Sequence, residues 1–314
     1  MKTIADLIQR AKTLSAEKGR VRIAVAAAQD EEVLVAVDAA RKDGLADAIL
    51  VGDRTLIGAI AKDHGIDLSN YQIVDEADVV RAAALAVDHV RRGDAAFVMK
   101  GILDTSVLLK AVLNKETGLN AGRLVSHVGV AESPNYHKLF LMTDAAINIA
   151  PSLQEKVDII KNAVDCARAL GIASPKVALL AAVEKVNPDK MPCTMDAAIL
   201  TQMNRRGQIK DCIIDGPLAL DNAISAESAR IKKIDSPVAG DADILVAPDI
   251  EAGNILYKAV IDLGGARGAG LVMGAGAPVV LTSRADTAET KHASIALAVL
   301  VAFSQKSETL PKLR

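Results

Sequence analysis

The sequence predicts an α/β protein of two domains whose sheets are mostly parallel. Short apolar segments of strand length alternate with longer segments of helical spacing along most of the 314 residues. Continuous apolar strands between helices are typical of parallel sheets that are covered on both faces. A chain of this length exceeds one ordinary hydrophobic core, so two domains of roughly 130 to 180 residues are expected.

Composition supports this class and limits the partners. Hydrophobic residues make up 51% of the chain, but only 2% are aromatic and tryptophan is absent. The core must therefore consist of Ala, Val, Leu and Ile, which suits closely packed α/β layers. The net charge of -2 and the pI near 6.2 give no overall field that would attract nucleic acid or an anionic membrane. Any anion must be bound by local groups.

The cysteines and the first segment point to a cytoplasmic protein. Cys166, Cys193 and Cys212 are odd in number and lack the spacing of a metal site. We expect three reduced thiols, as in cytoplasmic proteins, and no metal. Residues 1–12 have the spacing of an amphipathic helix with mixed charges, which differs from a signal peptide. No apolar run approaches the roughly 18 residues that a membrane span requires.

The first half of the chain repeats a strand followed by a helix. After the first helix, residues 21–27 are a short apolar strand and residues 31–41 have helical spacing. The later strands are predicted at 48–52, 71–74 and 95–99, and the helices that follow them at 55–64, 77–92 and 105–113. Ligands of such sheets bind outside the carboxyl ends of the strands.

Lys100 and Gly101 stand where the strand 95–99 should end, and Asp104 and Thr105 can start the next helix. A lysine at this position can meet a phosphate. A solvated lysine before a glycine turn explains the same pattern equally well.

A hairpin is predicted next. Segments 124–130 and 138–143 have the composition of strands, and the turn residues 133–136 join them. Arg123, Ser126 and His127 cluster beside this hairpin. His127 is more often a structural residue than a ligand contact, because a lone histidine usually satisfies its hydrogen bonds within the fold.

The alternation then resumes and implies a second sheet. A long amphipathic helix covers residues 152–170. The further strands are predicted at 175–183, 211–215, 243–247 and 269–273, and the further helices at 196–206, 218–230 and 252–263. The glycine-rich segment 264–270 follows no strand, so it is not a dinucleotide fingerprint. A P-loop and a GxSxG motif are also absent from the sequence.

The last segment is the strongest candidate for a site. A β-branched strand at 277–283 is predicted to pass directly into a helix that includes the apolar run 293–303, so Ser283 and Arg284 would lie at a helix N-terminus. Free N–H groups and the helix dipole favour an anion there, and arginine adds a fixed positive charge. The alternative is that Ser283 or Asp286 only caps the helix, since Ser283 with Asp286 and Asp286 with Glu289 both fit a capping box. Capping leaves Arg284 unexplained.

The chain resembles the phosphate acetyl/butyryltransferase family, and within it the butyryl-transferring members most. The motifs that carry the resemblance are ordered and dense and cover nearly the whole chain: 99–101, 108–114, 125–127, 143–151, 215–218, 236–240, 248–249, 252–258 and 280–286.

The resemblance implies transfer of a short acyl group, butyryl in the first place, between coenzyme A and inorganic phosphate. Acyl-CoA and phosphate would give acyl phosphate and free CoA, with no metal or redox cofactor. The resemblance also implies two α/β domains with a cleft between them, as in isocitrate and isopropylmalate dehydrogenases. Domain I would comprise 1–133 and 270–314, completed by the C-terminal helix, and domain II 134–269. Homo-oligomers are usual in this family.

The resemblance also suggests roles for residues. Ser283 would donate a hydrogen bond to the carbonyl or phosphate oxygen, and Arg284 would neutralise charge on phosphate and on the tetrahedral oxyanion. A carboxylate would take the proton of the CoA thiol, with Glu289 as first choice and Asp286 as second. The substrate contacts would come from two groups of residues: Lys100, Gly101, Arg123 and Ser126 for phosphate or the CoA phosphates, and Gly253 and Asn254 for the cleft.

Three alternatives remain at the level of sequence. The first is an acetyl-transferring enzyme of the same family. The second is a metal- and NAD-dependent 2-hydroxyacid decarboxylating dehydrogenase, in which Asp215 and Asp249 could bind a metal if their strand ends converge. The third is a regulator that binds CoA or acyl phosphate without turnover.

Overall fold

The computed structural model describes residues 1–283 and 286–309. The chain forms two compact units. One contains Ala5–Arg123 and Ala269–Arg314, and is called the terminal unit below. The other contains Met1–Ile4 and Leu124–Gly268, and is called the central unit. Residues 124–133, which the sequence prediction assigns to domain I, lie in the central unit because the hairpin strand that they form pairs there.

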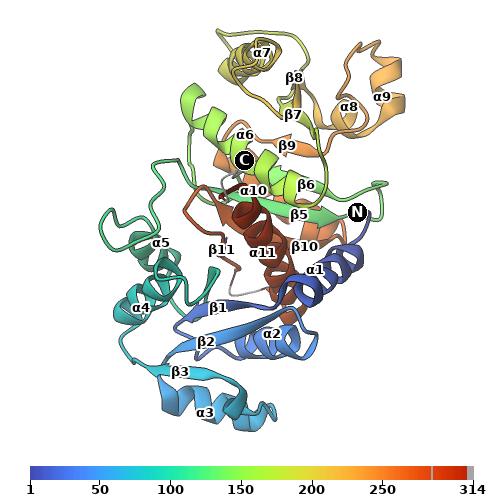
Figure 1. Cartoon of the computed structure of the whole chain (residues 1–314). Helices are drawn as coiled ribbons and strands as arrows, with labels where there is room; N and C mark the ends of the chain where they lie inside the picture. Colours follow the sequence, from blue (N-terminus) through green and yellow to red (C-terminus); the bar gives the residue numbers. More distant parts are fainter. Residues whose placement is uncertain (284–285, 310–314) are drawn as a thin grey trace, which may run out of the picture. The chain divides into compact units, whose positions relative to one another are not determined.

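The strands of the terminal unit are parallel except where β10 pairs with β11 (Figure 1). Its strands run in the order β3-β2-β1-β4-β11-β10, and only β10 and β11 pair antiparallel. The strands are β1 (Val21–Ala26), β2 (Ala46–Gly52), β3 (Gln72–Asp75), β4 (Phe97–Lys100), β10 (Arg267–Met273) and β11 (Val279–Val280). The predicted series of strand and helix is confirmed for this unit.

Aspartates start three of the helices that follow these strands. The side chains of Asp30, Asp53 and Asp78 each accept a hydrogen bond from a backbone N–H of the first turn, as N-cap residues do. The helices of this unit are α1 (Ile4–Lys18), α2 (Glu31–Lys42), α3 (Arg54–Asp63), α4 (Val79–Arg91), α5 (Thr105–Val112) and α11 (Ala288–Thr309), with a short 3₁₀ turn η1 (Leu68–Asn70).

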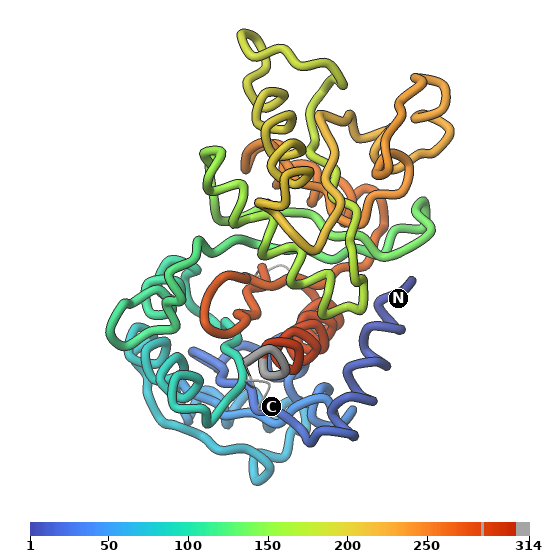
Figure 2. The backbone as a smooth tube through the Cα atoms, turned by 45° about the horizontal axis from the view of Figure 1, so that its top comes forward, coloured from blue at the N-terminus to red at the C-terminus, as the bar shows by residue number. Residues whose placement is uncertain are grey.

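Helix α11 is the core helix of the terminal unit. Its residues 293–303 are all buried, so this stretch is surrounded by protein on every side. Figures 1 and 2 show α11, in red, against the blue N-terminal segments of the same unit, and it packs on α2. Ser294 ties the helix to the sheet, because its hydroxyl accepts the N–H of Gly270 at 2.9 Å. Within the described residues, no helix combines the length and the apolar character that a membrane crossing needs.

The strands of the central unit run in the order β5-β6-β9-β7-β8. β5 and β6 form the predicted antiparallel hairpin, and the other pairs are parallel. The strands are β5 (Ser126–Glu132), β6 (Phe140–Thr143), β7 (Lys176–Leu180), β8 (Ile213–Leu218) and β9 (Ile244–Val246).

One helix of the central unit differs from the prediction. The helix expected at 218–230 is two short helices, because Ser225 leaves the helical conformation and its side chain caps the second one. The helices of this unit are α6 (Leu153–Ala169), α7 (Pro192–Arg205), α8 (Leu220–Ile224), α9 (Ala226–Ile231) and α10 (Ile250–Lys258), and α10 continues into a π-helical turn, η2 (Ala259–Leu263).

Candidate functional site

The carboxyl ends of β1, β4 and β11 lie at one edge of the terminal sheet. β4 pairs parallel with β1 on one side and with β11 on the other. Val280, the last residue of β11, is opposite Met99 of β4. The segment that leads to Ser283 therefore leaves the sheet beside Lys100 and Gly101, in the position where ligands of parallel sheets bind.

Lys100 and Gly101 occupy the predicted strand end. Gly101 donates its N–H to the carbonyl of Ala26 at 2.8 Å, which continues the pairing of β4 with β1. A Cβ at Gly101 would lie 2.0 Å from the carbonyl oxygen of Ala27, so only glycine fits here. The Lys100 side chain is buried, and its Nζ lies 3.4 Å from the carbonyl oxygens of Gly101 and Leu103. It is thus not the fully solvated lysine of the alternative interpretation.

A loop separates β11 from α11, contrary to the prediction of a direct passage from strand to helix. β11 ends at Val280 and α11 begins at Ala288. Helix α11 is capped by Thr287, whose hydroxyl accepts the N–H of Thr290 at 3.3 Å. Ser283 and Asp286 are therefore not the cap residues of this helix, and the apolar run misled the prediction because Leu281 and Thr282 have strand propensity without pairing.

Ser283 and Asp286 form a closed turn in front of α11. The N–H of Ser283 donates to the Asp286 carboxylate at 2.7 Å, and the N–H of Asp286 donates to the carbonyl of Ser283 at 3.2 Å. Ser283 is exposed, as is Glu289 in the first turn of α11. The remaining predicted catalytic residue, Arg284, lies outside the described residues. The turn can thus present a serine hydroxyl close to a helix N-terminus.

Lys291 is a residue at this turn that the sequence analysis missed. Its side chain is buried, and its ammonium group donates a hydrogen bond to the carbonyl of Asp286. A lysine among Thr, His and Ala looks like an exposed helix residue. The available signal was its spacing, because Lys291 precedes the buried Ile295 by four residues and shares its helix face.

The predicted contacts of the central unit are mainly structural in this arrangement. Ser126 is fully buried, and its hydroxyl accepts a hydrogen bond from the Asn162 amide at 2.8 Å. The ring of His127 is also buried and lies edge-on to Tyr257, with 5.7 Å between ring centroids. Arg123 is partly exposed and is the last residue of the first segment of the terminal unit.

Gly253 and Asn254 support a loop instead of projecting from α10. A Cβ at Gly253 would lie 2.2 Å from the carbonyl oxygen of Asp144, so the helix can approach this backbone only with glycine. The Asn254 amide donates to the carbonyl of Ala145 at 2.9 Å. Both residues therefore fix the start of the loop that follows β6.

Asp144, which the sequence analysis left without a role, organises that loop. Its buried carboxylate accepts the N–H groups of Ala146, Ile147 and Asn148 at 2.8, 3.1 and 3.2 Å, and the Asn148 side chain as well. A carboxylate that accepts several N–H groups fixes a backbone turn firmly. The loop lies at the carboxyl end of β6, the edge of the central sheet at which ligands are expected.

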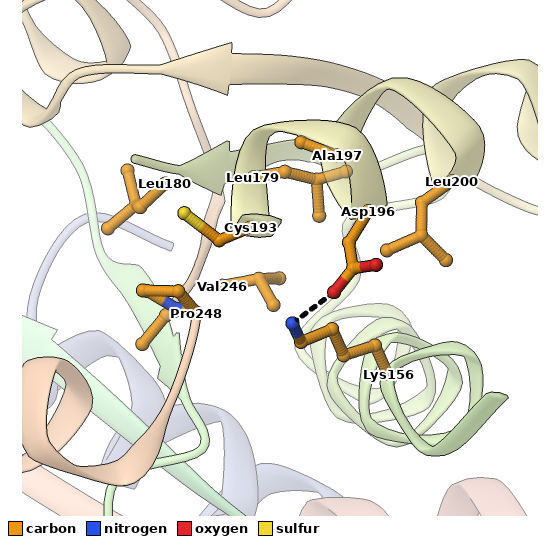
Figure 3. A pocket seen from close by; sticks show the side chains of 10 residues that line it. Lys156, Leu179, Leu180, Cys193, Asp196, Ala197, Leu200, Val246 and Pro248 are labelled. Carbon is orange, nitrogen blue, oxygen red and sulfur yellow. Dashed lines mark hydrogen bonds and ion pairs between the residues drawn. The ribbon is translucent and has the colours of Figure 1, made fainter. Parts of the chain in front are cut away.

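A small apolar pocket lies at the carboxyl ends of β7 and β9 (Figure 3). Lys156 and Asp196 form an ion pair in its wall at 2.6 Å, and Cys193 also lines it. Burial raises the pKa of the Cys193 thiol, which keeps this group protonated and weakly nucleophilic near neutral pH. The space of about 10 Å³ is of the order of one water molecule and is too small for an acyl chain.

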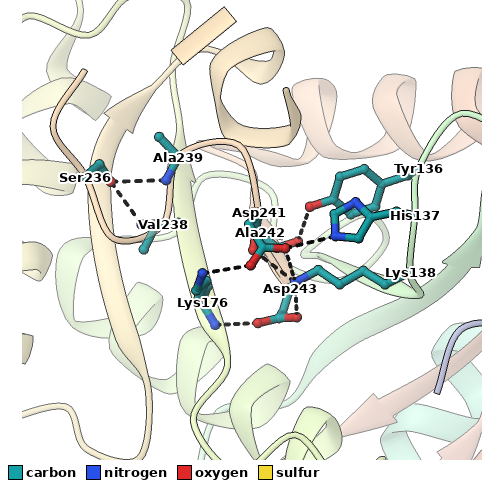
Figure 4. Close-up of polar contacts among 10 residues, drawn as sticks. All are labelled: Tyr136, His137, Lys138, Lys176, Ser236, Val238, Ala239, Asp241, Ala242 and Asp243. Atoms are coloured by element: carbon teal, nitrogen blue, oxygen red, sulfur yellow. Dashed lines mark hydrogen bonds and ion pairs between the residues drawn. The ribbon is translucent and has the colours of Figure 1, made fainter. Parts of the chain in front are cut away.

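The opposite edge of the central sheet carries a dense ionic network (Figure 4). Lys138 contacts both Asp241 and Asp243, at 2.8 and 2.6 Å, and Lys176 contacts Asp241 at 2.7 Å. Burial raises the pKa of Asp241, but the hydrogen bonds and charges of the two lysines more than offset this and hold the pKa well below its usual range. The network precedes β6, β7 and β9, so it stabilises strand starts and is distant in the sheet from the ligand edge.

No group of three or more His, Cys, Asp or Glu side chains within the described part of the chain is arranged to hold a metal ion. Asp249, one of the two acids considered for a metal, instead caps α10 by accepting the N–H of Ala252 at 2.8 Å.

Comparisons with known proteins converge on one group. The family model described as phosphate acetyl/butaryl transferase matches residues 3–84 and 77–299. The chain is 50% identical to the phosphate butyryltransferase of Clostridium acetobutylicum, over 96% of this chain and 99% of the relative. It is 46% identical to the phosphate acetyltransferase of Thermotoga maritima, over 91% and 96%. A solved branched-chain phosphotransacylase from Enterococcus faecalis is 36% identical, with a TM-score of 0.79 over 90% of this chain and 99% of that one.

Proposed function

Because the chain belongs to the phosphate acetyl/butyryl transferase family, we propose that it transfers a short acyl group, butyryl by preference, between coenzyme A and inorganic phosphate. An oxygen of phosphate attacks the thioester carbonyl, the carbon–sulfur bond breaks, and the products are acyl phosphate and free CoA. The reverse reaction is attack of the CoA thiolate on the acyl phosphate. The observation that carries this proposal is the 50% identity to a phosphate butyryltransferase over nearly the whole length of both chains.

The turn at Ser283 supplies the groups that this reaction needs. Its hydroxyl donates a hydrogen bond to the carbonyl oxygen as negative charge develops, and Arg284 neutralises the phosphate. One preorganised donor of this kind is often worth about 3 kcal/mol in the transition state. The position of the turn beside Lys100 and Gly101, at the ligand edge of a parallel sheet, supports this assignment.

A carboxylate next to the turn serves as the general base for the CoA thiol. An unperturbed thiol has a pKa near ~8.5, so a base accelerates attack near neutral pH. We assign this role to Glu289 in the first place, because the Asp286 carboxylate already accepts the N–H of Ser283. The chemistry needs neither a metal nor a redox cofactor, since the thioester and the acyl phosphate are both activated.

The remaining predicted substrate contacts fall into two groups, one that binds substrate directly and one that acts through the fold. Lys100, Gly101 and Arg123 bind the phosphate or the phosphates of CoA. Ser126, Gly253 and Asn254 act on substrate only indirectly, through the buried contacts and the loop that they stabilise. The predicted likeness of the fold to isocitrate and isopropylmalate dehydrogenases remains part of the proposal.

The acyl length separates the two candidate activities. The 46% identity to a phosphate acetyltransferase favours acetyl-CoA as the second candidate. The experiment is phosphate-dependent release of CoA from acetyl-, propionyl-, butyryl- and isobutyryl-CoA, compared by kcat/KM. Each buried methylene is worth ~1 to 3 kcal/mol, so butyryl-CoA should exceed acetyl-CoA by at least about tenfold. A higher value for acetyl-CoA would reverse the assignment, and no phosphate-dependent release with any substrate would reject the proposed function.

We also propose that the protein is a homo-oligomer that associates through α10 and η2. Ile255 and Leu263 of this segment are 69% and 88% exposed. Glu251 and Lys258 lie seven residues apart and so share a face of α10. A second copy packed antiparallel would therefore bring Glu251 to the partner's Lys258 at two symmetric places, with the apolar side chains between them.

A further inference from the structure

Lys291 is one of the largest fully buried side chains of the protein, with 2% of its surface exposed. It lies in the first turns of α11, and its ammonium group donates to the carbonyl of Asp286. The chemistry proposed above for the turn at Ser283 does not use this residue. A lysine buried to this extent needs a physical explanation, because lysine is almost never fully buried unless it is paired.

The charge of Lys291 has no counter-ion among the described carboxylates. Across the side chains that the structure describes, no carboxylate forms an ion pair with its ammonium group. Lys156, another buried lysine, pairs with Asp196 at 2.6 Å. A carbonyl oxygen accepts a hydrogen bond but does not neutralise a full charge. Since an isolated buried charge is costly, the fold retains Lys291 at the expense of stability.

The location of this charge identifies its counter-ion. Lys291 holds the last residue of the Ser283–Asp286 turn, and this turn leaves the sheet beside Lys100. The N-terminal end of α11 contributes a partial positive charge at the same place. Lys291 and the N-terminal end of α11 thus both contribute positive potential at this turn, and a dianion bound there would compensate it.

We propose that Lys291 is a positioning residue for the phosphate group of the reaction. It fixes the turn through the carbonyl of Asp286. It also supplies positive charge next to the turn, which the phosphate dianion compensates. This inference rests on the proposed function. The ammonium group does not touch the substrate, so its effect is on phosphate and acyl phosphate and not on the thioester.

The experiment compares Lys291→Met, which removes the charge at similar volume, with Lys291→Arg, which retains it. Lys12→Met is the matched control, because Lys12 is a partly exposed lysine of the same unit that pairs with Asp43 at 3.0 Å. In the CoA-release assay, Lys291→Met should raise the KM for phosphate about tenfold or more and leave the KM for butyryl-CoA within about twofold. Lys291→Arg should recover most of the phosphate affinity, and Lys12→Met should match the wild type.

A purely structural role predicts a different result. Equal changes in both KM values, or a loss of thermal stability with an unchanged KM for phosphate, would overturn the proposal. A second measurement does not depend on folding of the variants: the Lys291 side-chain ammonium signal of the wild type, followed by NMR, should shift on titration with inorganic phosphate. An unchanged signal at saturating phosphate would also overturn it. If the wild type releases no CoA in the presence of phosphate, the proposed function fails instead.

Discussion

Ser283 and Asp286 are joined by two hydrogen bonds, one from the Ser283 N–H to the Asp286 carboxylate and one from the Asp286 N–H to the Ser283 carbonyl, so the exposed serine belongs to a defined turn. The sequence was sufficient to identify the candidate residues of this site, because Ser, Arg and two acids follow an apolar strand. It could not predict the turn itself, since the choice between helix and turn depends on Thr287 as the cap and on buried Lys291.

The two candidate bases can be separated by isosteric changes. Glu289→Gln should lower kcat for attack of CoA on acyl phosphate by about 10²-fold, because general-base catalysis contributes at least that much. Asp286→Asn should cost only a few-fold, since an amide oxygen can still accept the N–H of Ser283. The measurement is formation of the thioester from acyl phosphate and CoA. The opposite order of effects would assign the base to Asp286.

Loss of the serine hydroxyl gives a separate prediction. Ser283→Ala should lower kcat by about 10²-fold and shift the unfolding transition only slightly, because alanine keeps the N–H and carbonyl through which this residue bonds to Asp286. Steady-state kinetics and a urea titration check both parts. Turnover within a few-fold of the wild type would mean that Ser283 does not stabilise the transition state.

Gly101 offers a test of the strand end. Gly101→Ala places a methyl group 2.0 Å from the Ala27 carbonyl oxygen, so the free energy of unfolding should fall by about 1 to 3 kcal/mol. Gly58 in α3 is a suitable control, because a Cβ there meets no atom within 4 Å. Gly58→Ala should stabilise the protein by about 0.5 to 1 kcal/mol, as expected for alanine in a helix. Similar urea midpoints for both variants would contradict the close approach.

At the scale of elements, the order of strands and helices was largely readable from the sequence because apolar runs and helical spacing are local signals. The errors fall where a local pattern competes with a specific hydrogen bond. Ser225 divides one predicted helix, and Thr287 delays the start of another. Apolar runs and helical spacing do not show which backbone N–H groups will be capped by a side chain.

Helix α11 docks on α2 through His292, which gives the protein a pH dependence at this contact. Burial lowers the pKa of His292, and the nearby Lys12 lowers it further, although Asp43 at 3.2 Å acts in the opposite direction. Because its pKa is lower in the folded state, this histidine binds a proton at a higher pH in the unfolded state than in the folded state as the pH decreases. Its contribution to stability is therefore present above the unfolded pKa near 6.5 and is lost as the pH falls below it.

The expected result is a difference between two proteins. The free energy of unfolding of the wild type should fall between pH 7.5 and 5.5 by more than that of His292→Gln, which cannot titrate. Urea titrations at both pH values measure it, and using the difference removes the contribution of the other histidines. Parallel decreases in the two proteins would show that His292 does not titrate on unfolding in this range.

At the scale of the whole molecule, the resemblance supplied what local patterns could not. The return of the C-terminal segment to pair β11 with β4 joins residues that are far apart in the chain, and no local signal specifies such a pairing. Chain length alone was enough to predict two domains. It could not show that residues 124–133 belong to the central unit, because that depends on the pairing of β5 with β6.

The proposed association through α10 and η2 can be tested on the intact protein. Replacement of both Ile255 and Leu263 by Glu should lower the molar mass measured by light scattering after gel filtration, because the two protomers together would bring four charges into the interface. Val80→Glu in α4 is the control, since Val80 is also an exposed apolar residue, at 59%. A wild-type monomer, or a double variant with unchanged mass, would reject this surface.

The ribosome makes helix α11 long after strands β1 to β4, yet this helix fills the interior of the unit to which those strands belong. A nascent chain that has completed β1 to β4 still lacks the helix that buries their apolar face, and it lacks the turn at Ser283 as well. These early strands must therefore remain unfolded, or bound by chaperones, until α11 has been translated. Premature termination upstream of α11 would therefore remove folding and activity together, which prevents a truncated product from persisting as a partly working enzyme.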